Sequence, residues 1–275
     1  MIIDGRVLAK NMLARIRVRA EKLSPQPRVL AIVVSETPAT LSYLKIKRMR
    51  AADAGCVLDV VRFPLGVSTA ELRSAVAASD ATAVIVQLPL PTGINAQEVC
   101  AAIPLLKDAD VLSAAAREKF ANNDADALLP PVVGAVREIF AHSNVDVKGK
   151  RVVVIGDGWL VGNPCAIWLK QQGADVKVLT IESTPEDLAA ALCAADIVIS
   201  GAGSPHLIKP DMIKDGVVLI DAGASESGGV VAGDADPSCA EKCSLFTPVP
   251  GGVGPPAVAY LFENGVSLAE RAMNI

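Results

Sequence analysis

Tyr43 and Lys47 are the first side chains whose types and spacing could do chemistry, because residues four apart lie side by side on a helix. Thr37-Pro38 has the pattern of an N-cap followed by proline at the first helical position, and Gly55 that of a C-terminal stop. These signals predict a helix over about Pro38–Ala54. Taken alone, a solvated tyrosine and lysine on a helix surface are more common than a catalytic pair.

The residues of this predicted helix divide into two sides. Those expected to pack against the rest of the domain are Leu41, Leu44, Met49 and Ala52. Those expected to project from another side are Tyr43, Lys47 and Arg50.

Gln87 is a second candidate, because this polar amide directly follows the apolar run Ala83–Val86 and precedes Leu88-Pro-Leu-Pro91. Sites in parallel α/β sheets assemble where strands end, so a polar residue at this point could face a ligand. Further charges come from Lys107-Asp-Ala-Asp110, after a helical pattern over Ala96–Ile103. By itself this charged segment would be interpreted as a solvated loop.

A glycine-rich turn predicts a dinucleotide site. Gly156, Gly158 and Gly162 follow the apolar run Arg151–Ile155 and precede a helical pattern that continues through Gln172. Their spacing is GxGxxxG, one residue longer than the GxGxxG fingerprint. A helix that began here would present its positive end to a pyrophosphate. The alternative is a glycine turn that closes an ordinary strand-helix unit.

An acid in the right place strengthens the dinucleotide hypothesis. Glu182 follows the next predicted strand, Val176–Ile181, where a ribose-binding acid is expected, although a solvated acid after a strand is common. The cofactor-binding residues predicted in this half of the chain are Gly156, Asp157, Gly158, Val161, Gly162, Glu182, Gly201 and Ala202.

The segment Thr247–Pro255, Thr-Pro-Val-Pro-Gly-Gly-Val-Gly-Pro, cannot form a regular element. Its prolines restrict φ and remove donors, while its glycines permit positive φ and close backbone approach. It is therefore either a shaped loop beside a ligand or a structural connector. The following segment, Pro256–Met273, is predicted to be a helix.

Composition and patterning predict an α/β protein. Hydrophobic residues make up 51% of the 275 residues and aromatic residues 3%, which is typical of sheet and helix layers filled by Ala, Val, Leu and Ile. Runs rich in β-branched residues alternate with helical patterns, which favours mainly parallel sheets. The predicted strands are Val29–Val34, Leu58–Phe63, Ala83–Val86, Arg151–Ile155, Val176–Ile181, Ile197–Ser200 and Val217–Ile220. The pattern weakens between Ala109 and Pro131, where we expect the domain junction.

Several classes of function are disfavoured. A net charge of −4 without a long basic run argues against nucleic-acid binding, and no apolar stretch reaches the roughly 18 residues of a membrane span. The N-terminus lacks a signal-peptide pattern, so we expect a cytoplasmic protein. The six cysteines lack CxxC spacing and a histidine partner in the sequence, so we expect small buried side chains and no metal.

Five segments, taken together, resemble the bifunctional methylenetetrahydrofolate dehydrogenase/methenyltetrahydrofolate cyclohydrolase family. They are Tyr43-x3-Lys47, Val86-Gln-Leu-Pro-Leu-Pro91, Lys107-Asp-x-Asp110, Val154-Ile-Gly-x-Gly-x-x-Val-Gly-x-Pro164 and Thr247–Pro255. They occur in the family's order across almost the whole chain. The resemblance implies oxidation of 5,10-methylenetetrahydrofolate with NAD(P), hydrolysis of the methenyl product to 10-formyltetrahydrofolate, and a homodimer.

The resemblance also implies an architecture and residue roles. An N-terminal catalytic domain, 1–125 plus 257–275, would bind folate in a cleft beside a Rossmann-type domain, 126–256, with the last helix returning to the first domain. Lys47 would be the central polar catalyst, with Gln87 holding it, while Tyr43 would stack on the aminobenzoyl ring and Asp110 would bind the pterin. The implied substrate-binding residues are Tyr43, Lys47, Gln87, Leu88, Asp110, Pro250, Gly251 and Gly252.

Several positions depart from the family pattern. They are Val111-Leu112 in place of Gly-Phe, Leu129–Gly134 without its usual hydroxyl, Asp157 at a position that is sometimes basic, Gly158 in place of Ser, and Pro256-Ala257 in place of an apolar residue and Thr. The family usually takes NADP, whereas Asp157 and Glu182 would repel a 2′-phosphate and favour NAD. The alternatives are a diverged homologue that is non-catalytic or has one activity, and another two-domain dehydrogenase of the shikimate type.

Overall fold

The computed structural model describes residues 1–34, 38–227 and 230–273 and divides the chain into two compact units. The three-strand unit comprises Lys10–Pro131 and Val258–Ile275, and the five-strand unit comprises Met1–Ala9 and Val132–Ala257. Residues 1–9, which we expected in the first domain, lie in the five-strand unit because Ile3 N donates to Phe246 O at 2.9 Å. The return of the last helix to the first domain is as predicted.

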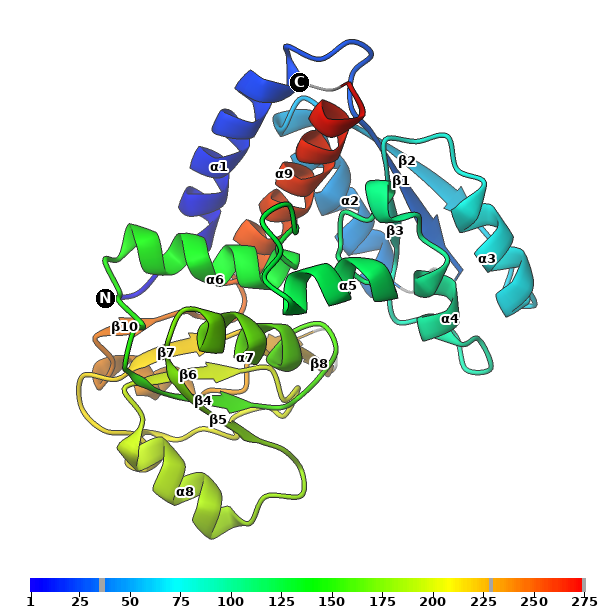
Figure 1. Cartoon of the computed structure of the whole chain (residues 1–275). Coiled ribbons are helices and arrows are strands. Elements are labelled where there is room, and N and C mark those ends of the chain that lie inside the picture. The colour runs from blue at the N-terminus through cyan, green and yellow to red at the C-terminus, as the bar shows by residue number, and fades with distance from the viewer. Residues whose placement is uncertain (35–37, 228–229, 274–275) are drawn as a thin grey trace. The chain divides into compact units, whose positions relative to one another are not determined.

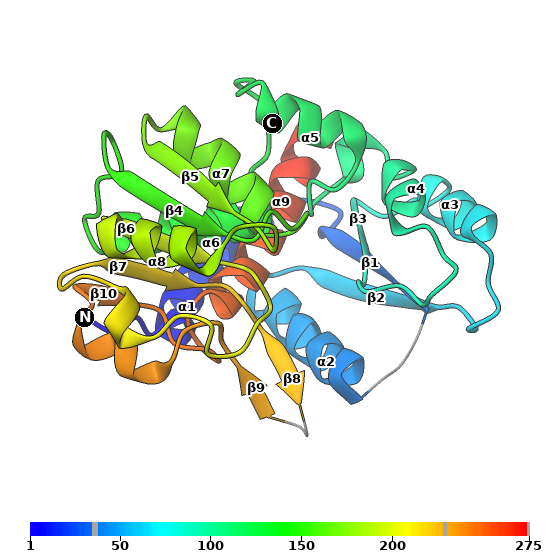
Figure 2. The ribbon, with the colours of Figure 1, turned by 90° about the horizontal axis from the view of Figure 1, so that it is seen from below.

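The three-strand unit contains a parallel sheet in the order β2-β1-β3. Its strands are β1 (Arg28–Val33), β2 (Val57–Arg62) and β3 (Ala83–Val86). Its helices are the larger part of α1 (Gly5–Ala20), α2 (Pro38–Asp53), α3 (Thr69–Ala77), α4 (Ala96–Ala101), η1 (Leu105–Lys107), α5 (Ala114–Ala121) and most of α9 (Gly254–Ala272). Helices α3 and α4 lie side by side in both views (Figures 1 and 2). Strand β3 is fully buried, which matches its uniformly apolar sequence.

The five-strand unit has the predicted Rossmann-type arrangement, a parallel sheet in the order β10-β7-β6-β4-β5. Its strands are β4 (Arg151–Ile155), β5 (Asp175–Leu179), β6 (Ile197–Ser200), β7 (Val218–Asp221) and β10 (Leu245–Phe246), with a separate antiparallel pair β8 (Ser225–Ser227) and β9 (Val230–Ala232). The helical segments are α6 (Pro131–His142), α7 (Gly162–Gln171), α8 (Pro185–Ala194), η2 (Pro210–Met212) and η3 (Pro237–Glu241). Helices α7 and α8 lie on opposite faces of this sheet (Figure 1). The chain reverses direction across the sheet at β4, the position where open α/β sheets bind ligands.

The buried side of α2 differs from the predicted one. Leu44 is buried as expected, but Leu41 and Met49 are 46% and 51% exposed. The residues that turn inward are Leu44, Lys47 and Ala51, at helical spacings of three and four, so Lys47 lies on the inner side and is only partly exposed. The apolar pattern had assigned the two sides wrongly. The predicted N-cap, Thr37, lies outside the described residues.

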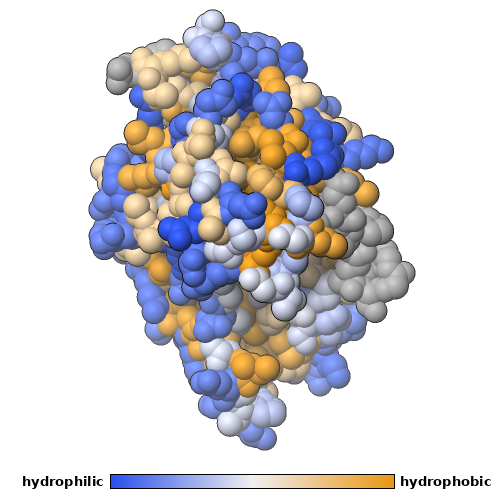
Figure 3. All heavy atoms as spheres, turned by 90° about the vertical axis from the view of Figure 1, so that its right-hand side faces the viewer, coloured by the Kyte–Doolittle hydropathy of each residue, from blue (hydrophilic) through white to orange (hydrophobic). Residues whose placement is uncertain are grey.

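The surface carries apolar side chains among polar ones, as the face in Figure 3 shows.

Five of the six cysteines are buried, as expected, while Cys193 is exposed. Burial raises the pKa of the Cys56, Cys100 and Cys165 thiols to about 12, so these side chains behave as small apolar groups. Among the described residues, no helix is long and apolar enough to cross a membrane.

Helix α9 is tied to the rest of the three-strand unit by a buried amide. Asn264 is 2% exposed, and its Nδ2 donates to Ala109 O at 2.8 Å and to Leu129 O at 2.9 Å. The Arg19 guanidinium of α1 binds both Glu263 and Glu270 of α9. Asn264 therefore satisfies two carbonyls from segments that precede it by more than a hundred residues.

We predict that Asn264→Leu lowers the free energy of unfolding by about 2–4 kcal/mol, because two carbonyls lose their donor in an apolar environment. Asn122→Leu is the matched control, since Asn122 is exposed after α5. Urea denaturation of both variants measures the difference. A loss no larger for Asn264→Leu than for Asn122→Leu would contradict the assigned role.

Candidate active site

Lys47 of α2 and Gln87, which directly follows β3, form a direct contact. The Lys47 ammonium donates to Gln87 Oε1 at 2.9 Å. Gln87 Nε2 donates to Leu88 O at 2.8 Å, which orients the amide so that its oxygen faces the lysine. Gln87 is anchored by its backbone N–H, which donates to Ile32 O of β1. The predicted pairing of these two residues is present, although it joins α2 to a strand end 40 positions away.

Burial shifts both charged groups of this cluster. Removal from water lowers the pKa of Lys47, and the nearby negative charge of Asp110 partly opposes that change. Burial raises the pKa of Asp110 to about 6; the Lys47 charge opposes the rise and the Asp108 charge adds to it. The charge of each group thus opposes the pKa shift that burial causes in the other. The net result is a lowered pKa for Lys47 and a raised pKa for Asp110.

Asp108 builds the turn that carries Asp110. It is 1% exposed, in contrast to the solvated loop expected of this segment, and it pairs with Val84 of β3 in a parallel bridge. Its carboxylate accepts from Leu112 N at 3.1 Å and from Ser113 N at 2.7 Å. Because the bridge aligns the segment with β3, Asp110 lies beside the end of the strand that leads into Gln87.

Val111 has an unusual backbone conformation next to Asp110. Its φ is 58°, in the left-handed region, and its side chain is buried. A β-branched residue rarely adopts this φ, and such strain costs on the order of 1–3 kcal/mol. Glycine, the residue the family pattern has at this position, meets no such penalty. The departure at Val111 therefore introduces local strain beside a candidate site residue.

Tyr43 lies one helical turn before Lys47 on α2 and is 45% exposed. Its ring is therefore accessible to a ligand. Leu88, partly buried, follows Gln87, and the Leu88–Pro89 peptide bond is cis. The three-strand unit thus brings Tyr43, Lys47, Gln87 and Asp110 to one end of its sheet.

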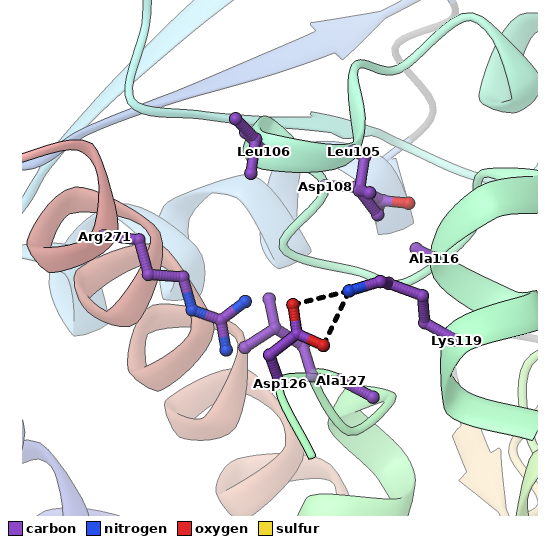
Figure 4. Close-up of a pocket in the computed structure, with 9 residues that line it drawn as sticks. Leu105, Leu106, Asp108, Ala116, Lys119, Asp126, Ala127 and Arg271 are labelled. Carbon is purple, nitrogen blue, oxygen red and sulfur yellow. Dashed lines mark hydrogen bonds and ion pairs between the residues drawn. The ribbon is translucent and has the colours of Figure 1, made fainter. Parts of the chain in front are cut away.

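A separate pocket of the three-strand unit contains none of these four side chains (Figure 4). It lies between η1, α5 and the end of α9, with Leu105 and Leu106 along one side. Lys119 Nζ binds both carboxylate oxygens of Asp126, at 2.6 and 2.5 Å, and this contact lowers the pKa of Asp126. Its lysine is already paired with a carboxylate, so this pocket is not the candidate active site.

Glycines allow close backbone approach in the dinucleotide turn of the five-strand unit. A Cβ added at Gly162 would lie 1.8 Å from Gly156 O, and one at Gly201 would lie 2.4 Å from a methyl group of Val161. Gly156 itself has φ 87°, and its added Cβ would lie 2.9 Å from Gly201 O. The turns after β4 and β6 therefore pack against each other directly, backbone to backbone.

Above these glycines the turn is open. No described atom lies within 4 Å of a Cβ added at Gly158, and Asp157 and Gly158 are both exposed. Helix α7 starts at Gly162, so its positive end faces this turn. These features fit a dinucleotide, whose pyrophosphate needs close backbone approach and a helix N-terminus.

Glu182 and Ala202 are exposed on the turns after β5 and β6. Strand β5 ends at Leu179 rather than at the predicted Ile181, which is fully exposed. Glu182 therefore stands three residues after the strand and not directly behind it. Strand β5 is the neighbour of β4, with Ile155 paired to Leu179, so Glu182 and Asp157 follow adjacent strand ends.

The proline- and glycine-rich segment packs against the N-terminus of the chain, within the five-strand unit. Gly5 N donates to Gly251 O at 2.9 Å, and a Cβ added at Gly5 would lie 1.8 Å from Gly252 O. Gly251 has φ 109°, and the Val249–Pro250 peptide bond is cis. The prolines that follow, including Pro256, occupy the first turn of α9, where a missing N–H is tolerated.

Two buried carboxylates were missed at the level of the sequence. Asp221 and Asp234 are 1% and 0% exposed. Asp234 accepts hydrogen bonds from the turn after β6, and Asp221 accepts one from the turn after β7. Burial raises the pKa of Asp221 to about 6, although N–H groups of Ala235 and Gly223 donate to it. The only available signal was an acid beside glycine after a strand, in Asp221-Ala-Gly223 and Gly233-Asp234, which is too common to stand out.

Comparison with known families agrees with this architecture. Residues 3–110 match the family model of the tetrahydrofolate dehydrogenase/cyclohydrolase catalytic domain, and residues 130–273 match that of the NAD(P)-binding domain.

Individual relatives match along nearly their full length. Bifunctional protein FolD of Lactococcus lactis subsp. cremoris (strain MG1363) is 36% identical over 283 residues, covering 99% of this chain and 98% of the relative. Bifunctional protein FolD of Aliarcobacter butzleri (strain RM4018) is 34% identical over 280 residues, covering 98% and 96%. The crystal structure of the Trypanosoma brucei N5,N10-methylenetetrahydrofolate dehydrogenase-cyclohydrolase, complexed with NADP cofactor and inhibitor, is similar with a TM-score of 0.94 and 30% identity, covering 100% and 99%.

We predict that Lys47→Met raises the pKa of Asp110 above its value of about 6, because a cation that favours the ionised carboxylate is removed. Titration of ¹³C-labelled aspartate carboxyls by NMR measures the shift, with Asp110→Asn identifying the signal. Lys45→Met, on the exposed side of the same helix, should leave the titration unchanged. An unchanged or lower pKa in Lys47→Met would show that the two charges do not interact.

Proposed function

Since this chain belongs to the tetrahydrofolate dehydrogenase/cyclohydrolase family, we propose that Lys47, Gln87 and Asp110 act together on a bound tetrahydrofolate derivative. The reactions are oxidation of 5,10-methylenetetrahydrofolate with NAD(P) and hydrolysis of the methenyl product to 10-formyltetrahydrofolate. The observation that carries the assignment of residues is the Lys47–Gln87 contact of 2.9 Å beside Asp110.

The dehydrogenase step makes few demands on acid or base groups. When bound, the nicotinamide ring accepts the hydride that leaves the methylene carbon. The residues we propose to hold the dinucleotide are Gly156, Asp157, Gly158, Val161, Gly162, Glu182, Gly201 and Ala202. Their close packing and the start of α7 support this assignment. Their task is orientation, since the folate loses a hydride and becomes a methenyl cation without a proton transfer.

Hydrolysis of the methenyl cation requires proton transfer, and Lys47 is suited to it. Water attacks the cationic carbon and loses a proton, and one C–N bond then breaks as its nitrogen gains a proton. Burial lowers the pKa of Lys47, so its neutral amine is available at lower pH than that of a solvated lysine. Gln87 Oε1 fixes the position of the amine without adding a charge.

The remaining residues bind substrate in this proposal. With a pKa of about 6, Asp110 is mainly ionised at pH 7 and can accept hydrogen bonds from the pterin. Tyr43, exposed on α2, would stack on the aminobenzoyl ring. Leu88, Pro250, Gly251 and Gly252 are the further substrate-binding residues that the family resemblance implies.

Family membership excludes the shikimate-type alternative. The remaining alternative, a homologue with one activity or none, is motivated by the strain at Val111 beside Asp110. Purified protein with methylenetetrahydrofolate and NAD or NADP should form reduced nicotinamide. Folate binding without turnover would favour this alternative over the proposed function.

We further propose NAD as the preferred cofactor. Asp157 and Glu182 are exposed on turns after the adjacent strands β4 and β5, where a ribose 2′-substituent is expected. A 2′-phosphate near either carboxylate would cost on the order of 1–4 kcal/mol at ~4 Å. The family's preference for NADP is the opposing consideration. The homodimer implied by the resemblance and the cytoplasmic location expected from the N-terminal sequence stay predictions.

One prediction of the proposed function concerns the role of Lys47 in hydrolysis. Replacement by methionine should lower the rate of methenyltetrahydrofolate hydrolysis at least about 100-fold, because the proton-transfer group is lost, while hydride transfer is retained. Absorbance of the methenyl compound and of reduced nicotinamide measures the two reactions separately. Lys45→Met is the control and should keep both rates. Unchanged hydrolysis in Lys47→Met would remove this lysine from the mechanism.

Another prediction concerns the preference between NAD and NADP. The wild-type kcat/KM should be higher with NAD than with NADP, and Asp157→Asn should raise the value for NADP about tenfold or more, because a repelling charge is removed. Asp175→Asn serves as the control, since Asp175 is exposed at the opposite end of β5. A strong wild-type preference for NADP would contradict the charge argument.

A further inference from the structure

One buried carboxylate holds the turn after β6 by three hydrogen bonds. Asp234 Oδ2 accepts from Ser200 Oγ at 2.7 Å and from Ala202 N at 2.8 Å, and its Oδ1 accepts from Ser204 N at 2.7 Å. The side chain is completely buried. Hydrogen bonds to a carboxylate are stronger than those between neutral groups, so this single side chain restrains residues 200–204.

Asp234 is itself braced by neighbouring segments. Gly223 leaves space for its carboxylate, because a Cβ at Gly223 would lie 2.1 Å from the Asp234 carboxyl carbon. The next residue, Ala235, donates its N–H to Asp221 Oδ2 at 2.9 Å, and Ile208 N donates to Asp234 O at 2.9 Å. The position of the Asp234 carboxylate is therefore fixed by segments outside the turn after β6.

The restrained turn contains two of the proposed dinucleotide-binding residues, Gly201 and Ala202. Gly201 N donates to Ile155 O at 2.9 Å, and its α-carbon packs against Val161 of the glycine turn. Two of the three donors to Asp234 are backbone amides, so the carboxylate determines the path of the main chain. Displacement of this turn would alter the surface it shares with the glycine turn.

We propose that Asp234 is a positioning residue for the dinucleotide, which holds the turn 201–204 in the conformation that binds NAD(P). This inference rests on the proposed function. It assigns to Asp234 no contact with the cofactor: its effect is transmitted through the amides of Ala202 and Ser204. The glycine turn after β4 would retain its own affinity for the pyrophosphate when Asp234 is changed.

The test is Asp234→Asn in the full-length protein. The amide would keep an acceptor for Ser200 and Ala202 but place an NH₂ group against Ser204 N, so the turn loses one of its restraints. We expect the Kd for NADH, from its fluorescence, to rise about tenfold or more. The KM for the oxidised dinucleotide should rise by more than kcat falls, and hydrolysis of methenyltetrahydrofolate, which consumes no dinucleotide, should be affected less.

Two further variants make the result specific. Asp236→Asn changes a partly exposed carboxylate two positions away, which accepts only from Ser238 among the contacts described, and should keep the wild-type Kd. Ser200→Ala removes one of the three donors and should raise the Kd two- to fivefold. If Asp234→Asn does not fold, Ser200→Ala decides, and a wild-type Kd in that variant overturns the inference.

A purely structural role would give a different pattern. It would lower the urea midpoint of Asp234→Asn and leave the Kd of the folded protein unchanged, which would overturn the proposal. Failure of the proposed function is distinguishable, because wild-type protein would then form no reduced nicotinamide from methylenetetrahydrofolate, whereas the comparison of Kd values requires no turnover. Equal Kd values for wild-type protein and Asp234→Asn would overturn the positioning role of Asp234 and leave the proposed function standing.

Discussion

Burial of one primary amine is the constraint on which the candidate catalytic site depends. Lys47 lies on the inner side of α2, where removal from water lowers its pKa and where Gln87 and Asp110 are the polar groups that compensate it. A buried charge is tolerated only with such partners. The positions of Gln87 at the end of β3 and of Asp110 in the adjacent turn follow from this requirement.

The five-strand unit relies on a different physical principle. Its candidate site is built from backbone segments that approach within contact distance, which only glycine permits at Gly156, Gly162 and Gly201. Such close approach needs a rigid support, and the buried carboxylates Asp221 and Asp234 supply it by accepting hydrogen bonds from the surrounding turns. The three-strand unit thus presents a lysine with a lowered pKa, and the five-strand unit presents backbone turns in a fixed conformation.

The departures from the family pattern have unequal structural consequences. Val111 has a left-handed φ of 58°, which is costly for a β-branched residue, and the contacts of Asp108 around it maintain the turn. Gly158, by contrast, leaves open space that a side chain could occupy. Pro256 is accommodated in the first turn of α9, where no hydrogen bond is lost. The strain therefore concentrates beside Asp110.

The sequence by itself determined the α/β class, seven strands within two residues of their observed ends and the glycine turn, because period, turn residues and strand ends are local signals. The contact between Lys47 and Gln87 was implied by the resemblance to the family, and no local signal predicts it. The sequence assigned the sides of α2 wrongly and placed residues 1–9 in the wrong unit. Only the tertiary structure decided that Lys47 is turned inward, that Asp108 is buried, and that Asn264, Asp221 and Asp234 hold distant segments. Burial and hydrogen bonding between residues far apart in the chain depend on which surfaces meet, and no local pattern of residue types encodes that.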